Sequence, residues 1–401
     1  MTIPIIITIS ILLLLAYVFD ITSSKTKVPS VILLLFLGWI VKQASGIFSI
    51  VVPDLSPILP FLGAIGLILI VLEGSLELEF NKSKLRYIGK SSLIALIPML
   101  IFSFSLAGAF MFFENVGFKI GLANAIPFAI VSSAIAISSA QNLLPKNKEF
   151  ITYESSLSDI FGVILFNFIT LNDNIGTQSF GFFILELVLI LIVTFITTLG
   201  LAFLLSKIKH HVKYVPIILI IVLIYAISEV YHLPALIFIL LFGLFLGNLD
   251  ELRKNPFIYQ LRPGVLDREV RKFKELTGEI AFLIRSLFFL LFGYLIETSE
   301  LMNSSTILWA VAISVGIFSL RFLFLTFFKL PLRPLLFMAP RGLITILLFL
   351  SIPFAQQIEI ANKSLIIQVI LITAGIMMAG LITHKKKDSE INTNDDSYSM
   401  L

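Results

Sequence analysis

Segments of about twenty mostly apolar residues follow one another along almost the whole chain, separated by short polar connections. A helix needs about 20 such residues to cross the hydrocarbon core of a bilayer. Of the 401 residues, 58% are apolar and only 13% are charged, whereas a soluble domain carries roughly 25% charged residues. This much apolar surface exceeds what a soluble core can bury, so the sequence predicts an all-α polytopic membrane protein.

The apolar segments predict thirteen transmembrane helices. They are expected at residues 3–19, 28–44, 57–78, 88–113, 121–144, 150–171, 180–206, 212–231, 233–249, 275–297, 305–328, 335–355 and 364–383. The first segment has neither a positive stretch before it nor a small-residue cleavage site, so it is expected to be a retained span. The absence of cysteine excludes disulfides and thiolate chemistry.

The distribution of basic residues predicts the orientation, because Lys and Arg concentrate in cytoplasmic loops. With the N-terminus outside and the C-terminus cytoplasmic, only Lys42, Lys119 and Lys363 of the 29 Lys and Arg residues fall in outer loops. We therefore expect a multi-pass protein of the cell (inner) membrane with a short cytoplasmic tail at 388–401. The basic residues are scattered over many short loops, which argues against a nucleic-acid partner.

One longer loop carries a second pattern. Between residues 265 and 276, apolar residues recur at helical spacing among charged ones. This predicts an amphipathic helix lying on the inner membrane surface. A plain basic cytoplasmic linker is the alternative.

The sixth predicted span carries an acidic residue at membrane depth. Asp159 lies about two turns into this span, and Ser155 shares its helical face because it precedes Asp159 by four residues. A charge at mid-bilayer costs at least about 2.5–3.5 kcal/mol, so such residues usually face a cavity and have a function. Carboxylate and hydroxyl oxygens suit a monovalent cation, and the same carboxylate can instead take a proton. The alternative is an Asp that only ties two helices together.

Three other spans also break the apolar pattern. Glu73 in the third span could be a second carboxylate near a cation path, or an interfacial Glu that pairs with a nearby base. The fifth span contains a small, polar run that includes Ser132 and Ser133, and Pro340-Arg341-Gly342 lies in the twelfth. Both could hold unwound helices, which membranes tolerate only where the backbone is buried in protein or lines a cavity. For the serines, close helix packing through small residues is the alternative.

Buried arginines need acidic partners. We expect Arg341 to pair with Glu154 of the sixth span, and we interpret this pair as structural and not transported. Arg285 and Arg321 are expected to reach the inner interface or to pair with other carboxylates, such as those of Glu186 or Glu229.

These residues resemble the motifs of a known family. Residues 154–159, Glu-Ser-Ser-Leu-Ser-Asp, are similar to the Glu-Ser-Leu-Leu-Asn-Asp signature of the cation/proton antiporter superfamily, in its sodium/proton exchanger (NhaP-like) branch. Residues 72–76, Leu-Glu-Gly-Ser-Leu, resemble its Phe-Glu-Gly-Gly-Leu element, and residues 340–342 its Pro-Arg-Gly element. Phe288-Phe289 followed by Gly293 resembles its Phe-Phe-x-x-x-Gly element. The resemblance covers nearly the whole chain.

The resemblance implies a fold with inverted repeats and two discontinuous crossing helices. It also implies a homodimer in which a core bundle (88–171 and 305–383) moves like an elevator against a dimerisation bundle (1–80 and 212–297), with 180–206 as a linker. The implied cation and proton site consists of Asp159, Ser155 and Glu73, with the span-five backbone at Ser132 and Ser133 contributing. The Glu154–Arg341 pair is implied as well, and no cofactor beyond the transported ions.

The sequence departs from the family pattern where the broken helices should cross. The usual Thr-Asp-Pro of the fifth span is Ser132-Ser133-Ala134 here, and the usual Asn before the essential Asp is Ser158. The crossing must therefore be stabilised differently. The serine run is similar to that of Kef-type potassium/proton proteins, so the expected ion is sodium first, with potassium or lithium as alternatives.

The predicted function is secondary active antiport of a monovalent cation against protons, with a role in pH homeostasis. A transporter for another solute on the same fold is the alternative. An intramembrane enzyme is a remote one, because the sequence has no Cys, no paired catalytic aspartates and no His-Glu-x-x-His motif.

Overall fold

A computed structural model gives the fold of the chain. It describes residues 2–26, 28–48, 54–78, 85–172, 176–207, 214–231, 233, 235–248 and 263–383. Every regular element in these ranges is a helix. The tail predicted at 388–401 lies outside the described residues.

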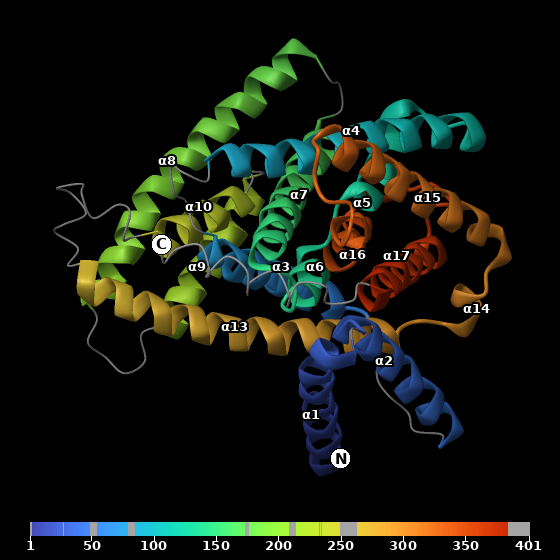
Figure 1. Cartoon of the computed structure of the whole chain (residues 1–401), viewed down its shortest axis with the longest axis horizontal. Helices are drawn as coiled ribbons and strands as arrows, with labels where there is room; N and C mark the ends of the chain where they lie inside the picture. The colour runs from blue at the N-terminus through green and yellow to red at the C-terminus, as the bar shows by residue number, and fades with distance from the viewer. Residues whose placement is uncertain are drawn as a thin grey trace, which may run out of the picture.

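The helices follow the predicted spans closely (Figure 1). They are α1 (Thr2–Thr26), α2 (Ser30–Ile47), α3 (Ile58–Glu77), α4 (Leu85–Glu114), α5 (Phe118–Ala129), α6 (Ser133–Ser139), α7 (Pro145–Leu171), α8 (Thr177–Lys207), α9 (Tyr214–Val230), α10 (Ala235–Gly247), α13 (Pro263–Tyr294), α14 (Thr298–Leu301), α15 (Ser304–Phe327), α16 (Leu343–Leu350) and α17 (Lys363–Thr383), with 3₁₀ turns η2 (Leu335–Phe337) and η3 (Phe354–Gln356). In the described ranges, nine helices are long and apolar enough to cross a membrane, and three shorter apolar ones accompany them. The total of thirteen spans stays a prediction.

Two spans are interrupted, as the sequence predicted. Between α5 and α6, Ile130 and Ser132 have extended backbone with ψ of 131° and 115°. Between η2 and α16, the chain from residue 338 to Gly342 is not helical. The two interruptions meet, because the Ser132 N–H donates to the Pro340 carbonyl at 2.9 Å. Each unwound segment thus satisfies part of the other's backbone.

The helices pack in two groups. In the first, α4 and α7 surround α5, α6 lies on α7, and α15 packs between α4 and α17. In the second, α13 packs along α2 and α3, and α10 packs on α3. α3 also contacts α6, α7 and α16, so it lies at the boundary between the groups (Figure 1). The broken helices are therefore enclosed, and residues 121–129 of α5 are all buried.

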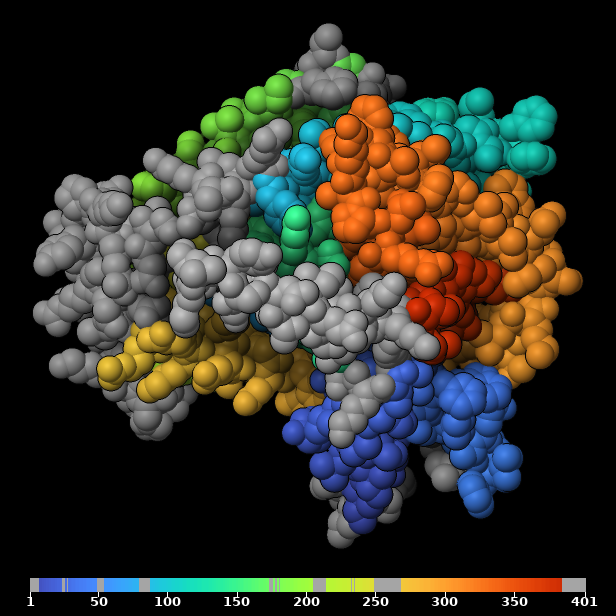
Figure 2. Space-filling view, viewed as in Figure 1, coloured from blue at the N-terminus to red at the C-terminus, as the bar shows by residue number. Residues whose placement is uncertain are grey.

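α1 and α2 project from the rest of the molecule, as Figure 2 shows in blue. Their exposed side chains are largely apolar, including Ile11, Leu14 and Val18 of α1 and Phe36 of α2. Such a surface requires lipid or another protein to cover it.

The amphipathic segment at 265–276 is not a separate surface helix, and that expectation is wrong. It forms the first part of α13, a single helix of 32 residues. Of its described apolar residues, Val270 and Phe273 are buried in protein, and Phe273 is in ring contact with Tyr214 and Phe242. Because α9 and α10 supply this apolar surface, the stripe does not need the membrane interface.

The connection between α13 and α15, which includes α14, is held from both groups. Lys42 of α2 forms an ion pair with Glu297. Lys363 of α17 pairs with Glu300 at 3.2 Å and donates to the Leu295 carbonyl at 2.6 Å. Two of the three lysines predicted on the outer side thus fix one short connection between the groups.

Replacing Glu300 tests this connection. Its carboxylate pairs with Lys363 and accepts the Glu297 N–H at 2.8 Å in a capping box. We expect Glu300→Ala to cost about 1 kcal/mol of folding stability and to lower the thermal unfolding midpoint of the protein in detergent. Glu359→Ala is the control, because Glu359 is exposed on a loop of the same side. Equal midpoints for the two variants would contradict this assignment.

Candidate functional site

α7 carries the polar residues of the site along its buried length. Glu154, Ser155, Ser158 and Asp159 are all at most 2% exposed. The helix begins with Pro145, which suits a first turn because its missing N–H has no helical partner there. Four polar side chains in this apolar interior each need a partner, and the partners differ.

Asp159 is only partly satisfied. Its Oδ2 accepts hydrogen bonds from the Ser133 hydroxyl and, at 3.4 Å, from the Ser133 N–H. Its Oδ1 has no hydrogen-bond partner among the described residues. Ser133 is the first residue of α6, so the carboxylate lies at the positive end of that helix. One carboxylate oxygen is thus held by Ser133, and the other has no hydrogen bond among the described residues.

The hydroxyl bonded to Asp159 is that of Ser133 and not of Ser155. Ser155 donates to the carbonyl of Ile151 on its own helix at 2.7 Å. A serine inside a helix commonly makes this local bond, which sequence spacing alone does not reveal. The role of Ser155 as a cation ligand stays a prediction.

The crossing of the broken helices is stabilised by Ser158 and Arg341. The Ser158 hydroxyl accepts the Val131 N–H at 3.0 Å. Arg341 donates to the carbonyls of Phe128 at 2.6 Å and Ala129 at 3.1 Å, which end α5 without helical partners. A cation there also suits the negative end of the helix. Arg341 thus stabilises the crossing although the fifth span has no Asp.

Gly342 allows the two unwound segments to approach. A Cβ at this position would lie 2.7 Å from both the Ser132 hydroxyl and the Ile135 side chain. No larger residue fits here unless these neighbours shift.

The predicted Glu154–Arg341 ion pair is wrong. Glu154 pairs instead with Arg321 of α15: both carboxylate oxygens accept from the guanidinium, Oε2 at 2.8 Å. Arg321 thus pairs with a carboxylate, which was one of the two expectations for it, but the partner is Glu154 and not Glu186 or Glu229. Arg321 also donates to the Leu335 carbonyl at 2.7 Å, so η2 helps to aim it at α7. Arg341 instead donates to three backbone carbonyls, those of Phe128, Ala129 and Ala339.

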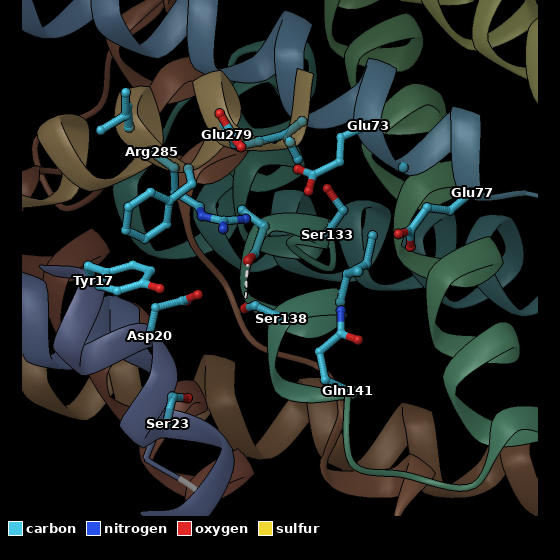
Figure 3. A pocket seen from close by; sticks show the side chains of 17 residues that line it. Tyr17, Asp20, Ser23, Glu73, Glu77, Ser133, Ser138, Gln141, Glu279 and Arg285 are labelled. Atoms are coloured by element: carbon cyan, nitrogen blue, oxygen red, sulfur yellow. Dashed lines mark hydrogen bonds between the residues drawn. The ribbon is translucent and has the colours of Figure 1, made fainter. Parts of the chain in front are cut away.

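A cavity of about 590 Å³ adjoins the site (Figure 3). α1, α3, α6 and α13 form its wall, which includes Glu73, Ser133 and Ala134. Asp159, Ser132 and Ser155 do not line it. Ser133 therefore connects the two parts of the site, because it faces the cavity and bonds to Asp159 behind it.

The cavity wall is acidic, and sequence reasoning missed most of its charges. Besides Glu73 it includes the carboxylates of Asp20, Glu77 and Glu279, against one arginine, Arg285. The sequence offered one signal for them, namely that these charged residues lie inside or beside predicted spans. Only the packing of α13 against α3, and of α1 against α13, brings them to one cavity.

The described residues contain no group of three or more His, Asp or Glu side chains that could hold a resident metal. The site instead combines a buried, half-free carboxylate with an acidic cavity and a crossing of two broken helices. This arrangement is typical of a secondary transporter.

Comparison with known proteins identifies the family. A family model described as sodium/hydrogen exchanger, transmembrane, matches residues 9–383, so the chain belongs to this family. No curated protein matches the sequence. Two solved structures of the sodium/proton antiporter MjNhaP1 from Methanocaldococcus jannaschii share the fold. One matches with a TM-score of 0.66 and 18% identity over 94% of this chain and 95% of the other. The second, from electron microscopy, gives 0.67 and 19% over 95% of each.

The Glu154–Arg321 pair yields a stability prediction. Arg321→Gln leaves a carboxylate buried without its counter-charge, and breaking a buried pair from one side costs about 3–5 kcal/mol. We expect a large fall in the thermal midpoint and in the yield of folded protein. The double variant Glu154→Gln/Arg321→Gln removes both charges and should recover part of the loss. A double variant as unstable as Arg321→Gln alone would show that the pair is not the cause.

Proposed function

We propose that the chain exchanges a monovalent cation for protons by alternating access, with Asp159 binding cation and proton in competition. The unpartnered Oδ1 of Asp159 carries the proposal. A buried carboxylate oxygen without a hydrogen bond is costly, and a proton or a cation would relieve that cost. Because both occupy the same oxygen, one excludes the other, which is the condition for exchange.

Glu73 and Ser133 complete the proposed path. Both face the cavity, and Ser133 bonds directly to Asp159. A cation attracted by the acidic wall would pass Glu73 and then use the oxygens of Ser133 and Asp159, with Ser155 and the backbone near Ser132 as further ligands. The proposal needs no cofactor, because the ions are the transported substrates.

The movement would follow the division into two groups of helices. Asp159 and Ser133 belong to α7 and α6 of the first group, whereas Glu73 belongs to α3 of the second. In the predicted orientation the cavity-lining parts of α1, α3, α6 and α13 are their cytoplasmic ends, so this conformation would face inward. A homodimer in the cell membrane, with α1 and α2 covered by lipid or by the partner, would provide the fixed frame.

Sodium is the proposed ion, in keeping with the family. The serine run at 132–133 offers hydroxyl oxygens where an Asp is usual, which keeps potassium and lithium as alternatives. Comparing the three ions in one assay of the purified protein in proteoliposomes decides between them.

The first test is Asp159→Asn. Purified wild-type protein in proteoliposomes should dissipate an imposed pH gradient when the cation is added. This variant should lose the activity, because an amide takes up no proton near neutral pH and carries no charge to neutralise a cation. Asp54→Asn is the matched control, since Asp54 is an exposed loop residue whose Oδ1 accepts from the Ser56 N–H. Activity of Asp159→Asn equal to that of the control would refute the assignment.

The second test concerns charge movement. If one carboxylate is neutralised by one proton or by one cation, each exchange moves no net charge. The membrane potential, about 2.3 kcal/mol per elementary charge at 100 mV, should then leave the exchange rate unchanged. We expect equal rates with the potential clamped at zero and at 100 mV. A rate that follows the potential would rule out one-for-one exchange.

A further inference from the structure

Arg285 is the arginine of the acidic cavity. Its side chain comes from α13, and Figure 3 shows it directed into the cavity. Among the described residues it forms neither a hydrogen bond nor an ion pair. A guanidinium is always charged and offers five donors. An unpaired one beside four carboxylates is therefore available to interact with more than one of them.

Glu73 is the less exposed of the two wall carboxylates that have no hydrogen bond or ion pair among the described residues, the other being the exposed Glu279. Glu77 is already 3.8 Å from Lys274, and Asp20 accepts the Ser30 hydroxyl at 3.2 Å. Glu73 has no such partner among the described residues. Its carboxylate faces the helix that carries Arg285, because a Cβ on Gly278 of α13 would lie 3.4 Å from Glu73 Oε1, and both side chains line the same cavity.

We propose that the guanidinium of Arg285 acts as a tethered cation that competes with the transported ion for Glu73. This competition sets the affinity for the ion on the cavity side of the site. The proposal rests on the function proposed above. When no ion is present, the guanidinium offsets the charge of Glu73 through the low-dielectric wall. When an ion arrives, Arg285 must give up this interaction. Glu279, in the same wall, can then take it.

Competition of this kind predicts a separation of kinetic constants. Removing the guanidinium should tighten the binding of the ion, so the KM for the cation should fall, about threefold to tenfold for a partly solvated charge pair. The maximal rate should change much less. A residue with a purely structural role would lower the rate or the stability without lowering KM.

The experiment compares Arg285→Gln and Arg285→Lys in proteoliposomes over a range of sodium concentrations. We expect Arg285→Gln to lower KM and Arg285→Lys, which keeps the charge, to stay near the wild-type value. Arg268→Gln is the matched control, because Arg268 lies on the same helix, is exposed, and does not line the cavity. In a Glu73→Gln background, Arg285→Gln should give no further decrease, since the group competed for is gone.

A second readout does not require transport. Added sodium should raise the thermal midpoint of the detergent-solubilised protein, and the concentration for half of this effect should fall in Arg285→Gln. Arg285→Met keeps the aliphatic stem and serves if the amide variant does not fold. Transport with an unchanged or higher KM in the variants overturns the role of Arg285. Absence of cation-dependent proton flux in the wild type instead refutes the proposed exchange itself.

Discussion

Unpaired peptide groups at the ends of two broken helices are the constraint on which the site depends. Neither water nor a continuous helix satisfies them at this depth, so the protein must supply partners. Arg341 takes the carbonyls that end α5, and Asp159 accepts the N–H that begins α6. Each charge suits the helix end that it faces. The carboxylate proposed to carry ions is thus also one that the fold requires.

Two carboxylates on α7 have different bonding partners, and this difference distinguishes a structural residue from a candidate ion-binding residue. Glu154 and Asp159 are five residues apart on one helix and equally buried at 2%. Both oxygens of Glu154 accept from Arg321, so its charge is already neutralised within the protein. Asp159 has one oxygen bound by a neutral serine and one unbound. A counter-charge neutralises Glu154, whereas Asp159 has none among the described residues, which suits the exchange proposed for it.

The composition of the sequence predicted the helical spans and the two interruptions, because these depend on local residues, whereas the role of Asp159 stays a prediction. The partner of Glu154 did not follow from the composition. Arg321 and Arg341 are equally polar interruptions of apolar spans, and only the packing of α15 on α4, with η2 beside it, brings Arg321 to Glu154. The choice of Ser133 over Ser155 likewise depends on where α6 begins relative to α7.

The position of the charges also bears on how exchange would be coupled to movement. Glu73 and Arg285 are on α3 and α13, whereas Asp159 and Ser133 are on α7 and α6. A displacement of one group against the other changes the distance from Asp159 to Glu73 but not from Glu73 to Arg285. Under the proposed mechanism, the ion would gain or lose one ligand during the movement, while the tethered arginine stays beside that ligand. Arg285 would then assist the release of the ion, because it stays next to Glu73 throughout the movement and competes with the ion for that carboxylate.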